Sequence, residues 1–116
     1  MTDETSGVGY VDIYLLPIPA DRVDEYRAQA TNSGSVVREL GGLSYREFRG
    51  DDLGEAFTKI ADADLLTAAV AEFESRAHRD QVMAAVMEDP RVTAMLEPVA
   101  DMSRMRYGGF ETFVTA

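Results

Sequence analysis

The sequence predicts an α+β fold with the element order β-α-β-β-α-β, and three patterns indicate it. Segments rich in β-branched and aromatic residues stand near both ends of the chain, at 8–19 and 105–115, and are typical of strands. Apolar residues in 20–40 recur at spacings of three, four and seven positions, as they do in an amphipathic helix. Ser75 can divide the alanine-rich stretch 64–90 into a strand followed by a helix.

The first predicted strand, VGYVDIYLLPIP at 8–19, has two largely apolar faces. Because side chains alternate along a strand, one face carries Val11, Ile13 and Leu15, and the other carries Tyr10, Asp12, Tyr14 and Leu16. The helices of a chain this short cover only one face of its sheet, so the other face needs a second cover. We therefore expect burial to be shared with another subunit.

The helix predicted over 20–40 has acidic residues near its start, where they favour the helix dipole, and the pair Gly41-Gly42 directly after its end. A second strand is predicted at 43–49, where the sequence reads LSYREFR. Residues 50–62 are predicted to form a loop, because two glycines stand beside two aspartates there.

The stretch from 64 to 90 has two interpretations. Its alanine content and the helical spacing of its apolar residues favour one long helix. That helix would be about 39 Å long, more than a domain of this size can cover. A break at Ser75 instead gives a strand over 64–74 and a helix over 76–89, with a short turn of helix over 91–98. The second interpretation yields the ferredoxin-like split βαβ arrangement.

Charge and composition argue against several classes of protein. The 116 residues carry 21 acidic and 11 basic side chains, and the formal net charge of −10 repels nucleic acid. The absence of cysteine excludes disulfides and thiolate sites. No apolar run approaches the roughly 20 residues of a membrane span, and MTDETSG at 1–7 does not resemble a signal peptide. We expect a soluble, cytoplasmic protein with a disordered acidic segment at 1–7 and one domain over 8–116.

Five short motifs follow one another along most of the chain: YVD at 10–12, YRE at 45–47, GDD at 50–52, SRAHRD at 75–80 and YGGF at 107–110. In this order and at these intervals they resemble the bacterial family known as domain of unknown function 1428. The most specific part is SRAHRD followed by V…VM…DPR and M.YGGF. That family in turn resembles the dimeric α+β barrel superfamily, in which two ferredoxin-like subunits pack their sheets face to face.

The resemblance implies a strand before Ser75 and a homodimer through the sheet faces, with the tyrosine face of the first strand inside the barrel. We then expect the dimer to bury Tyr10, Tyr14, Leu16 and either Phe110 or Phe113. No single reaction is implied, because the superfamily includes cofactor-free oxygenases, haem-degrading enzymes and isomerases. Family members usually have a longer stretch, with proline and lysine, where this chain has LGEAFTKIADAD, and bulkier aromatic residues in place of Thr67 to Ala71.

The motif SRAHRD places Arg76, His78 and Arg79 in the first turns of the helix that Ser75 would cap. Positive side chains oppose the helix dipole there, at a cost of a few tenths to about 1 kcal/mol each. Neighbouring acidic side chains can offset this cost as ion pairs. An anionic ligand can offset it as well, because a helix N-terminus with arginines binds anions. A lone histidine at such a position is more often a hydrogen-bonded residue at the edge of the core, and the alternative is that His78 contacts a ligand or takes part in catalysis.

Asp12 is the second candidate for chemistry. A carboxylate on an enclosed sheet face is costly unless it is paired. It either pairs with an arginine such as Arg46 or Arg106, or accepts a hydrogen bond from a tyrosine, or acts as a general base in a water-poor cavity. Tyr45 and Tyr107 complete the residues that we expect to line a cleft between helices and sheet.

We expect no cofactor and no metal. One histidine and no cysteine leave a zinc site without enough ligands. A carboxylate site from Asp51, Asp52 and Glu47 is conceivable without further support, and only His78 could serve as an axial haem ligand.

Two hypotheses of function remain. In the first, the cleft binds a small organic molecule, anionic ones included, with or without turnover. In the second, the homodimer is a non-catalytic interaction or regulatory module. A closed apolar cavity that receives His78 or Asp12 would favour the first hypothesis, whereas a filled interior with both residues paired would favour the second.

Overall fold

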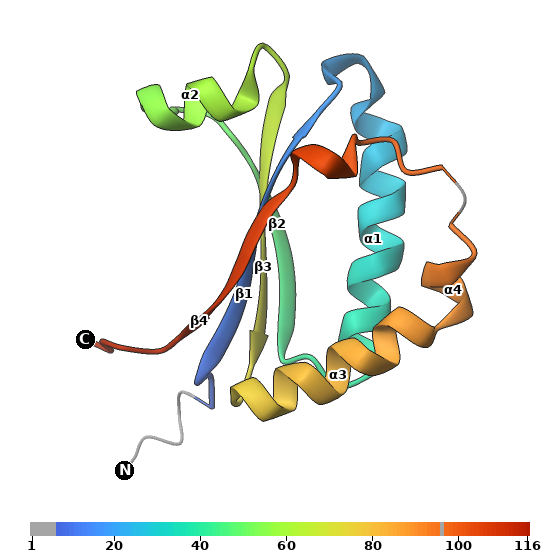
Figure 1. Ribbon diagram of the computed structural model, residues 1–116, viewed down its shortest axis with the longest axis vertical. Helices are drawn as coiled ribbons and strands as arrows, with labels where there is room; N and C mark the ends of the chain where they lie inside the picture. The colour runs from blue at the N-terminus through green and yellow to red at the C-terminus, as the bar shows by residue number, and fades with distance from the viewer. Residues whose placement is uncertain (1–6, 96) are drawn as a thin grey trace.

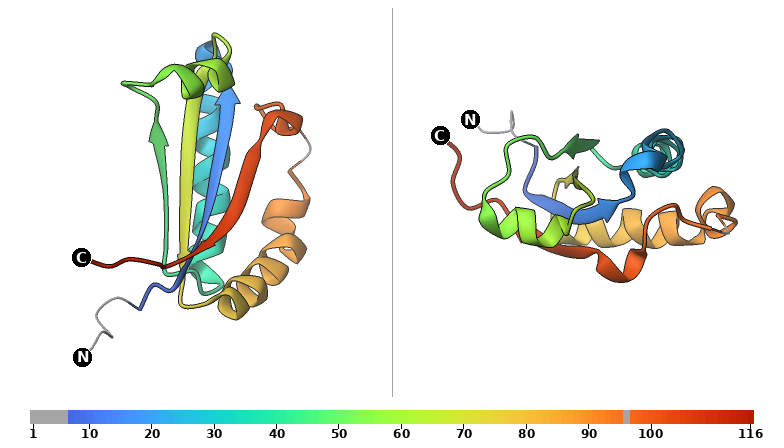
Figure 2. Two further views of the ribbon diagram at one scale, coloured as in Figure 1. Left: turned by 60° about the vertical axis from the view of Figure 1, so that its left-hand side comes forward. Right: turned by 90° about the horizontal axis from the view of Figure 1, so that it is seen from above.

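The computed structural model describes residues 7–95 and 97–116, and these form a four-stranded sheet with two long helices on one face (Figure 1). The strands are β1 (Tyr10–Ile18), β2 (Ser44–Arg49), β3 (Leu65–Phe73) and β4 (Arg106–Glu111). They lie side by side in the order β2-β3-β1-β4, and every pairing is antiparallel (Figure 2). The structure therefore confirms the predicted β-α-β-β-α-β arrangement.

The long helices connect the strands across one face of the sheet. They are α1 (Val23–Glu39) and α3 (Arg76–Glu88). The short turn η2 (Ala20–Arg22) precedes α1, and the short helix α4 (Pro90–Thr93) follows α3. A second short turn, η3 (Met102–Arg104), precedes β4. The predicted glycine pair ends α1. Gly41 has φ +121°, a conformation that glycine adopts without strain, and the Gly42 N–H donates to the carbonyl of Val37 at 2.9 Å.

Ser75 separates β3 from α3, as predicted. Its backbone is extended, and its hydroxyl accepts a hydrogen bond from the backbone N–H of His78 at 3.1 Å, so it is the N-cap of α3. Strand β3 is central in the sheet and pairs with β1 and β2 on its two edges. This pairing outweighs the helix propensity of its alanines, which is why the one-helix interpretation fails.

The loop predicted over 50–62 is wrong for seven of its residues, which form the helix α2 (Glu55–Ala61). The glycines and aspartates that suggested a loop lie mostly before this helix, and Gly54 is its N-cap. Helix α2 lies on the side of the sheet away from α1 and α3 (Figure 1). It contacts β1 and β3 near the end where Pro17 pairs with Leu66, and both of those residues are buried.

The two faces of the sheet have different covers, and the predicted assignment of these faces is wrong. Ala71 and Phe73 pack against Val36 and Val82, so the face of β3 that they share lies under α1 and α3. Tyr10 pairs with Phe73 across the β1–β3 ladder, which puts the tyrosine face of β1 under the helices as well. Both faces of β1 are apolar enough that alternation alone did not distinguish them.

The opposite face of the sheet, which we call the open face, is apolar, and no helix of the described residues covers most of it. Alternation and the strand register place on it Val11, Ile13, Leu15, Phe48, Ala68, Val70 and Phe110. Phe48 is 47% exposed and Phe110 is 53% exposed. Of the residues expected at the dimer interface, Phe110 lies on this face, whereas Tyr10, Tyr14 and Leu16 do not.

Three further observations concern the chain ends and β4. Strand β4 pairs with β1 in an unbroken register from Arg106 to Glu111, so its glycines do not form a bulge. Gly109 instead makes room for the ring of Tyr10, which a side chain at 109 would overlap. Residues 1–6 of the predicted disordered segment, and Leu96 of the predicted turn, lie outside the described residues. None of the helices in the described part of the chain is long and apolar enough to cross a membrane.

Candidate functional site

Asp12 and Arg79 form the centre of a polar cluster between the sheet and α3. Arg79 Nη1 lies 2.5 Å from Asp12 Oδ1, and the Tyr14 hydroxyl donates to Asp12 Oδ2 at 3.1 Å. Arg79 also pairs with Asp80 and lies over the ring of Tyr10, 5.0 Å from its centroid. The expected hydrogen bond from a tyrosine to Asp12 is therefore confirmed, while the arginine partner is Arg79 rather than Arg46 or Arg106.

The surroundings of this Asp12–Arg79 cluster keep Tyr14 and Arg79 in fixed protonation states. The Tyr107 ring stacks on Tyr14 with centroids 5.8 Å apart. Burial raises the pKa of Tyr14 well above its ordinary value, and the adjacent Asp12 charge adds to the rise. The hydrogen bond to Asp80, together with the Asp12 charge, raises the pKa of Arg79. Tyr14 thus stays a hydrogen-bond donor, and Arg79 stays a cation, at physiological pH.

His78 and Arg76 lie at the start of α3, outside that cluster. His78 Nδ1 accepts a hydrogen bond from the backbone N–H of Glu74 at 2.9 Å, and its ring meets Phe73 edge-on. Accepting at Nδ1 leaves the Nε2 position to carry the proton of the neutral ring. The Arg76 side chain is exposed. Asp12 and His78 therefore both have partners within the protein, the arrangement that favours a structural role at this end of the sheet.

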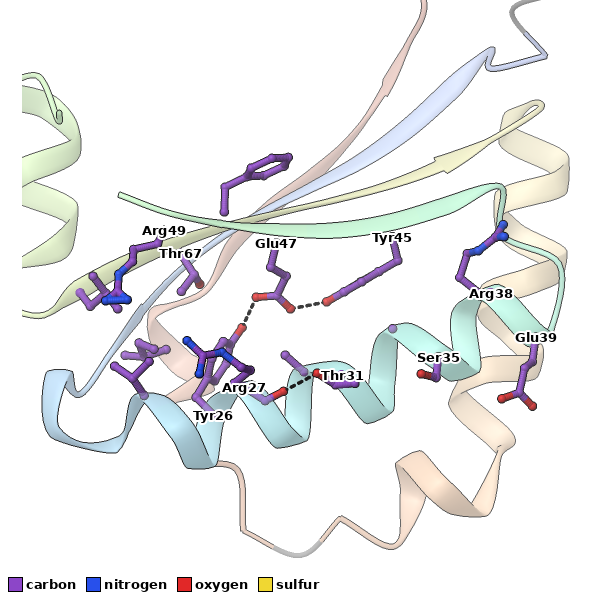
Figure 3. A pocket seen from close by; sticks show the side chains of 16 residues that line it. Tyr26, Arg27, Thr31, Ser35, Arg38, Glu39, Tyr45, Glu47, Arg49 and Thr67 are labelled. Atoms are coloured by element: carbon purple, nitrogen blue, oxygen red, sulfur yellow. Dashed lines mark hydrogen bonds between the residues drawn. The ribbon is translucent and has the colours of Figure 1, made fainter. Parts of the chain in front are cut away.

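A groove of about 660 Å³ lies between α1 and β2, and we call it the α1–β2 groove (Figure 3). Its walls combine the apolar residues Ile18, Val23, Ala30 and Leu65 with the polar residues Tyr26, Thr31, Tyr45, Glu47, Arg49 and Thr67. Of the residues proposed from the sequence, Tyr45 lines this groove, while Asp12, Arg76, His78, Arg79 and Tyr107 do not.

Glu47 is the polar centre of the groove. The Tyr26 hydroxyl, from α1, donates to Oε1 at 2.6 Å, and the Tyr45 hydroxyl donates to Oε2 at 2.5 Å (Figure 3). Burial raises the pKa of both tyrosines well above the ordinary value, and the Glu47 carboxylate adds to each rise. Both phenols therefore remain protonated donors at physiological pH, so two neutral groups hold the charged carboxylate in place.

Small residues make room for these large side chains. The strand register puts Ala69 between Tyr14 and Glu47, and Ala71 between Asp12 and Tyr45, on the helix-covered face of the sheet. On α1, Gly34 faces the Tyr45 ring so closely that a methyl group at 34 would overlap it. The small side chains of Ala69, Ala71 and Gly34 thus make room for the large polar side chains at the groove.

Gly34→Ala is expected to destabilise the protein by about 1–2 kcal/mol, although alanine is the better helix former, because the added methyl overlaps Tyr45. Urea unfolding measures the loss, and Ser35→Ala, an exposed neighbour on the same helix, serves as the control and should change stability by less than about 0.5 kcal/mol. A gain in stability for Gly34→Ala would contradict this packing.

The cations around the groove differ in what they contact. Arg27 pairs with Asp24, and Arg38 donates to the backbone carbonyls of Gly42 and Leu43. Among the residues that the structure describes, no carboxylate lies within ion-pair distance of Arg49. Within the described residues, Arg49 is therefore a cation without a carboxylate partner beside an apolar wall, in a chain with a net charge of −10.

The described residues contain no group of three or more histidine, aspartate or glutamate side chains arranged to hold a metal ion. Asp51 and Asp52 are exposed residues before α2, and Glu47 is held by the two tyrosines instead.

Of the polar groove residues, Tyr26, Glu47 and Arg49 are the most important ones that the sequence did not predict to line a cleft. A usable signal was present in YREFR at 45–49, where Tyr45, Glu47 and Arg49 alternate with residues of the other face. The position of α1 over the sheet could not be predicted, and only the packing of α1 brings Tyr26 to Glu47.

The fold is that of ferredoxin-like α+β proteins. A dimeric ferredoxin-like protein from an uncultured marine organism superposes with a TM-score of 0.62 at 11% identity, covering 94% of this chain and 97% of that one. A nipsnap family protein of unknown function from Agrobacterium tumefaciens superposes with a TM-score of 0.63 at 14% identity, covering 91% and 89%. At these identities the likeness concerns the fold alone.

The chain belongs to the family described as protein of unknown function, DUF1428, whose model matches residues 9–104. The uncharacterized protein YbaA of Escherichia coli K12 is 30% identical over 115 residues, which is 90% of this chain and 97% of that protein. YbaA of Shigella flexneri matches to the same extent. The resemblance drawn from the five motifs is thereby confirmed.

Proposed function

We propose that this protein binds a small organic molecule in the α1–β2 groove. The observation that carries the proposal is the groove itself, whose volume of about 660 Å³ lies within the range of small-molecule sites. Its composition is also typical of small-molecule sites, because it combines an apolar wall with a few polar groups that converge on Glu47. The candidate cleft between helices and sheet is therefore retained, with Tyr45 as its link to the sequence-based residues.

The charges favour an anionic ligand. Glu39 pairs with Arg91 at 2.9 Å and Arg27 pairs with Asp24, so Arg38 and Arg49 are the groove cations that have no carboxylate partner among the described residues. An acidic small molecule would meet a locally positive surface on a protein that is otherwise strongly negative. Turnover is not required for this role.

The test is a titration of isotope-labelled protein with a library of small organic acids, followed by backbone amide NMR. We expect the amides of Tyr26, Thr31, Tyr45, Glu47 and Arg49 to shift together and to saturate at millimolar concentration. Thr31 is an exposed residue of α1 that lines the groove, so Thr31→Trp should fill the groove and weaken binding by about tenfold or more.

Ala84→Trp is the matched control, because Ala84 is an exposed residue of α3 outside the groove. It should leave the titration unchanged. Shifts confined to Arg76, His78 and their neighbours would move the site to the start of α3, and no saturable shift with any acid would overturn the proposal.

We also propose that the protein is a homodimer through its open face. Large exposed apolar side chains gather on that side of the molecule: Phe48 and Phe110 on the sheet, Phe57 on α2, and Phe113 and Val114 in the C-terminal segment, which projects to the same side as α2 (Figure 1). Exposed apolar surface of this kind marks an interaction site. A solved structure with this fold is described as dimeric, which supports a second copy as the partner.

A further inference from the structure

The α1–β2 groove has two ends of opposite charge, because one face of β2 carries both Glu47 and Arg49. Glu47 and Arg49 are two residues apart on an extended strand, so their side chains leave the same face with an offset of about 7 Å. Both are directed toward α1, and Arg49 lies at the end of the groove that also holds Arg27 and Thr67 (Figure 3). A ligand that reaches both ends must satisfy an anion and a cation at this separation.

The Glu47 end can only accept hydrogen bonds. An ionised carboxylate offers about four lone-pair positions, and the Tyr26 and Tyr45 hydroxyls occupy two of them. Because both hydroxyls already donate to Glu47, their own remaining positions are acceptors too. In the described part of the chain no lysine, arginine or histidine pairs with Glu47. A ligand group placed here must therefore be a donor, such as a hydroxyl or an amino group.

The Arg49 end is suited to an anion. The guanidinium is a planar fork of donors that matches a carboxylate in two parallel hydrogen bonds. Arg27, the nearest other cation, is already paired with Asp24 at 3.0 Å. The wall at this end is apolar, formed by Ile18, Val23 and Leu65, so it suits the hydrocarbon body of a ligand.

We propose that the ligand class of the groove is a small organic acid that also carries a hydroxyl or an amino group. Its acidic group binds Arg49, its donor group binds Glu47, and a six-membered ring or a chain of about four carbons separates the two. This inference rests on the proposed function, because it specifies the ligand of the same groove.

The test compares four related aromatic probes: 4-hydroxyphenylacetate, 4-methoxyphenylacetate, phenylacetate and 4-methylphenol. Amide NMR titration gives a dissociation constant for each. We expect 4-hydroxyphenylacetate to bind about tenfold more tightly than either the methoxy or the unsubstituted acid, which lack the donor, and more tightly than 4-methylphenol, which lacks the acid. Replacing the ring with a chain, as in 5-hydroxypentanoate against pentanoate, should preserve the order.

Two variants test which group of the ligand binds at each end of the groove. Arg49→Gln should weaken the hydroxylated acid about tenfold and leave 4-methylphenol unchanged, whereas Glu47→Gln should weaken the hydroxylated acid and leave phenylacetate unchanged. Arg76→Gln and Glu74→Gln are the controls, because both residues are exposed and lie outside the groove. Thermal unfolding of each variant verifies that it is folded.

The outcomes separate the two proposals. If Thr31→Trp abolishes binding but the four probes bind equally, or Arg49→Gln has no effect, the proposed ligand class is overturned while the groove remains a binding site. If no probe saturates, or Thr31→Trp leaves binding intact, both the groove and its ligand class are overturned.

Discussion

Replacing Arg79 with methionine is expected to lower the free energy of unfolding by about 2–4 kcal/mol. The Asp12 side chain is only 5% exposed, and Arg79 is the cation that pairs with it. Without Arg79 the carboxylate keeps one hydrogen bond, from Tyr14, and a buried charge without a counter-ion destabilises the folded state. The lower limit of this loss in unfolding free energy is below that for a fully buried ion pair, because the Arg79 side chain is 20% exposed and water screens part of its interaction with Asp12.

Urea unfolding at a fixed protein concentration measures this loss, and two further variants identify its cause. Arg76→Met removes an exposed arginine three positions earlier on α3 and should change stability by less than about 0.5 kcal/mol. Asp12→Leu combined with Arg79→Met removes both charges and should recover at least half of the loss, since apolar residues of similar volume replace buried pairs well. Equal losses at 76 and 79 would contradict the assigned role of the pair.

Placing glutamates at Phe48 and Phe110 together is expected to raise the dissociation constant of the proposed homodimer by about 1,000-fold or more. The two side chains lie on the two edge strands of the open face, β2 and β4. A two-fold dimer buries each of them twice, and a large apolar side chain contributes about 1.5–3 kcal/mol when it is buried. The substitution replaces this contribution with the cost of burying a carboxylate.

Light scattering over a range of concentrations measures the change. The unmodified protein should have a mass of about twice 12.7 kDa, and the double variant should approach 12.7 kDa. Both phenylalanines are about half exposed in a single subunit, so the variant should keep its circular dichroism spectrum. Met87→Glu, at a 63% exposed position on α3, is the control and should stay dimeric. A monomeric unmodified protein, or dissociation of the control, would overturn the interface.

Local chemistry explains which parts of the fold could be predicted. Ser75 and the Gly41-Gly42 pair mark helix ends through hydrogen bonds to residues only three to five positions away, so the sequence alone identifies them. Helix α2 was missed because the turn residues at its start dominate a short segment, and its apolar residues are too few to establish a period.

Long-range packing explains what could not be predicted. Asp12 and Arg79 are 67 positions apart, and Tyr26 and Glu47 are 21 apart, so no local pattern links either pair. The two faces of β1 are both apolar, and only the packing of α1 and α3 decides which one they cover. As a result, the sequence identified Asp12 and Tyr45 as notable polar residues, and a tyrosine as a partner of Asp12, but it did not identify Arg79 or Glu47 as their partners.

Alternate residues of β2 lie on opposite faces of the sheet, one set toward α1 and the other toward the open face. Tyr45, Glu47 and Arg49 lie toward α1, while Arg46 and Phe48 lie toward the open face, where the Arg46 guanidinium lies 5.5 Å from the Phe48 ring centroid. With the proposed groove ligand and the proposed dimer, selection acting on odd-numbered positions of this short segment alters ligand preference, and selection acting on even-numbered positions alters self-association, each without a change in the other. Divergent relatives can thus inherit one property and lose the other within six residues of chain.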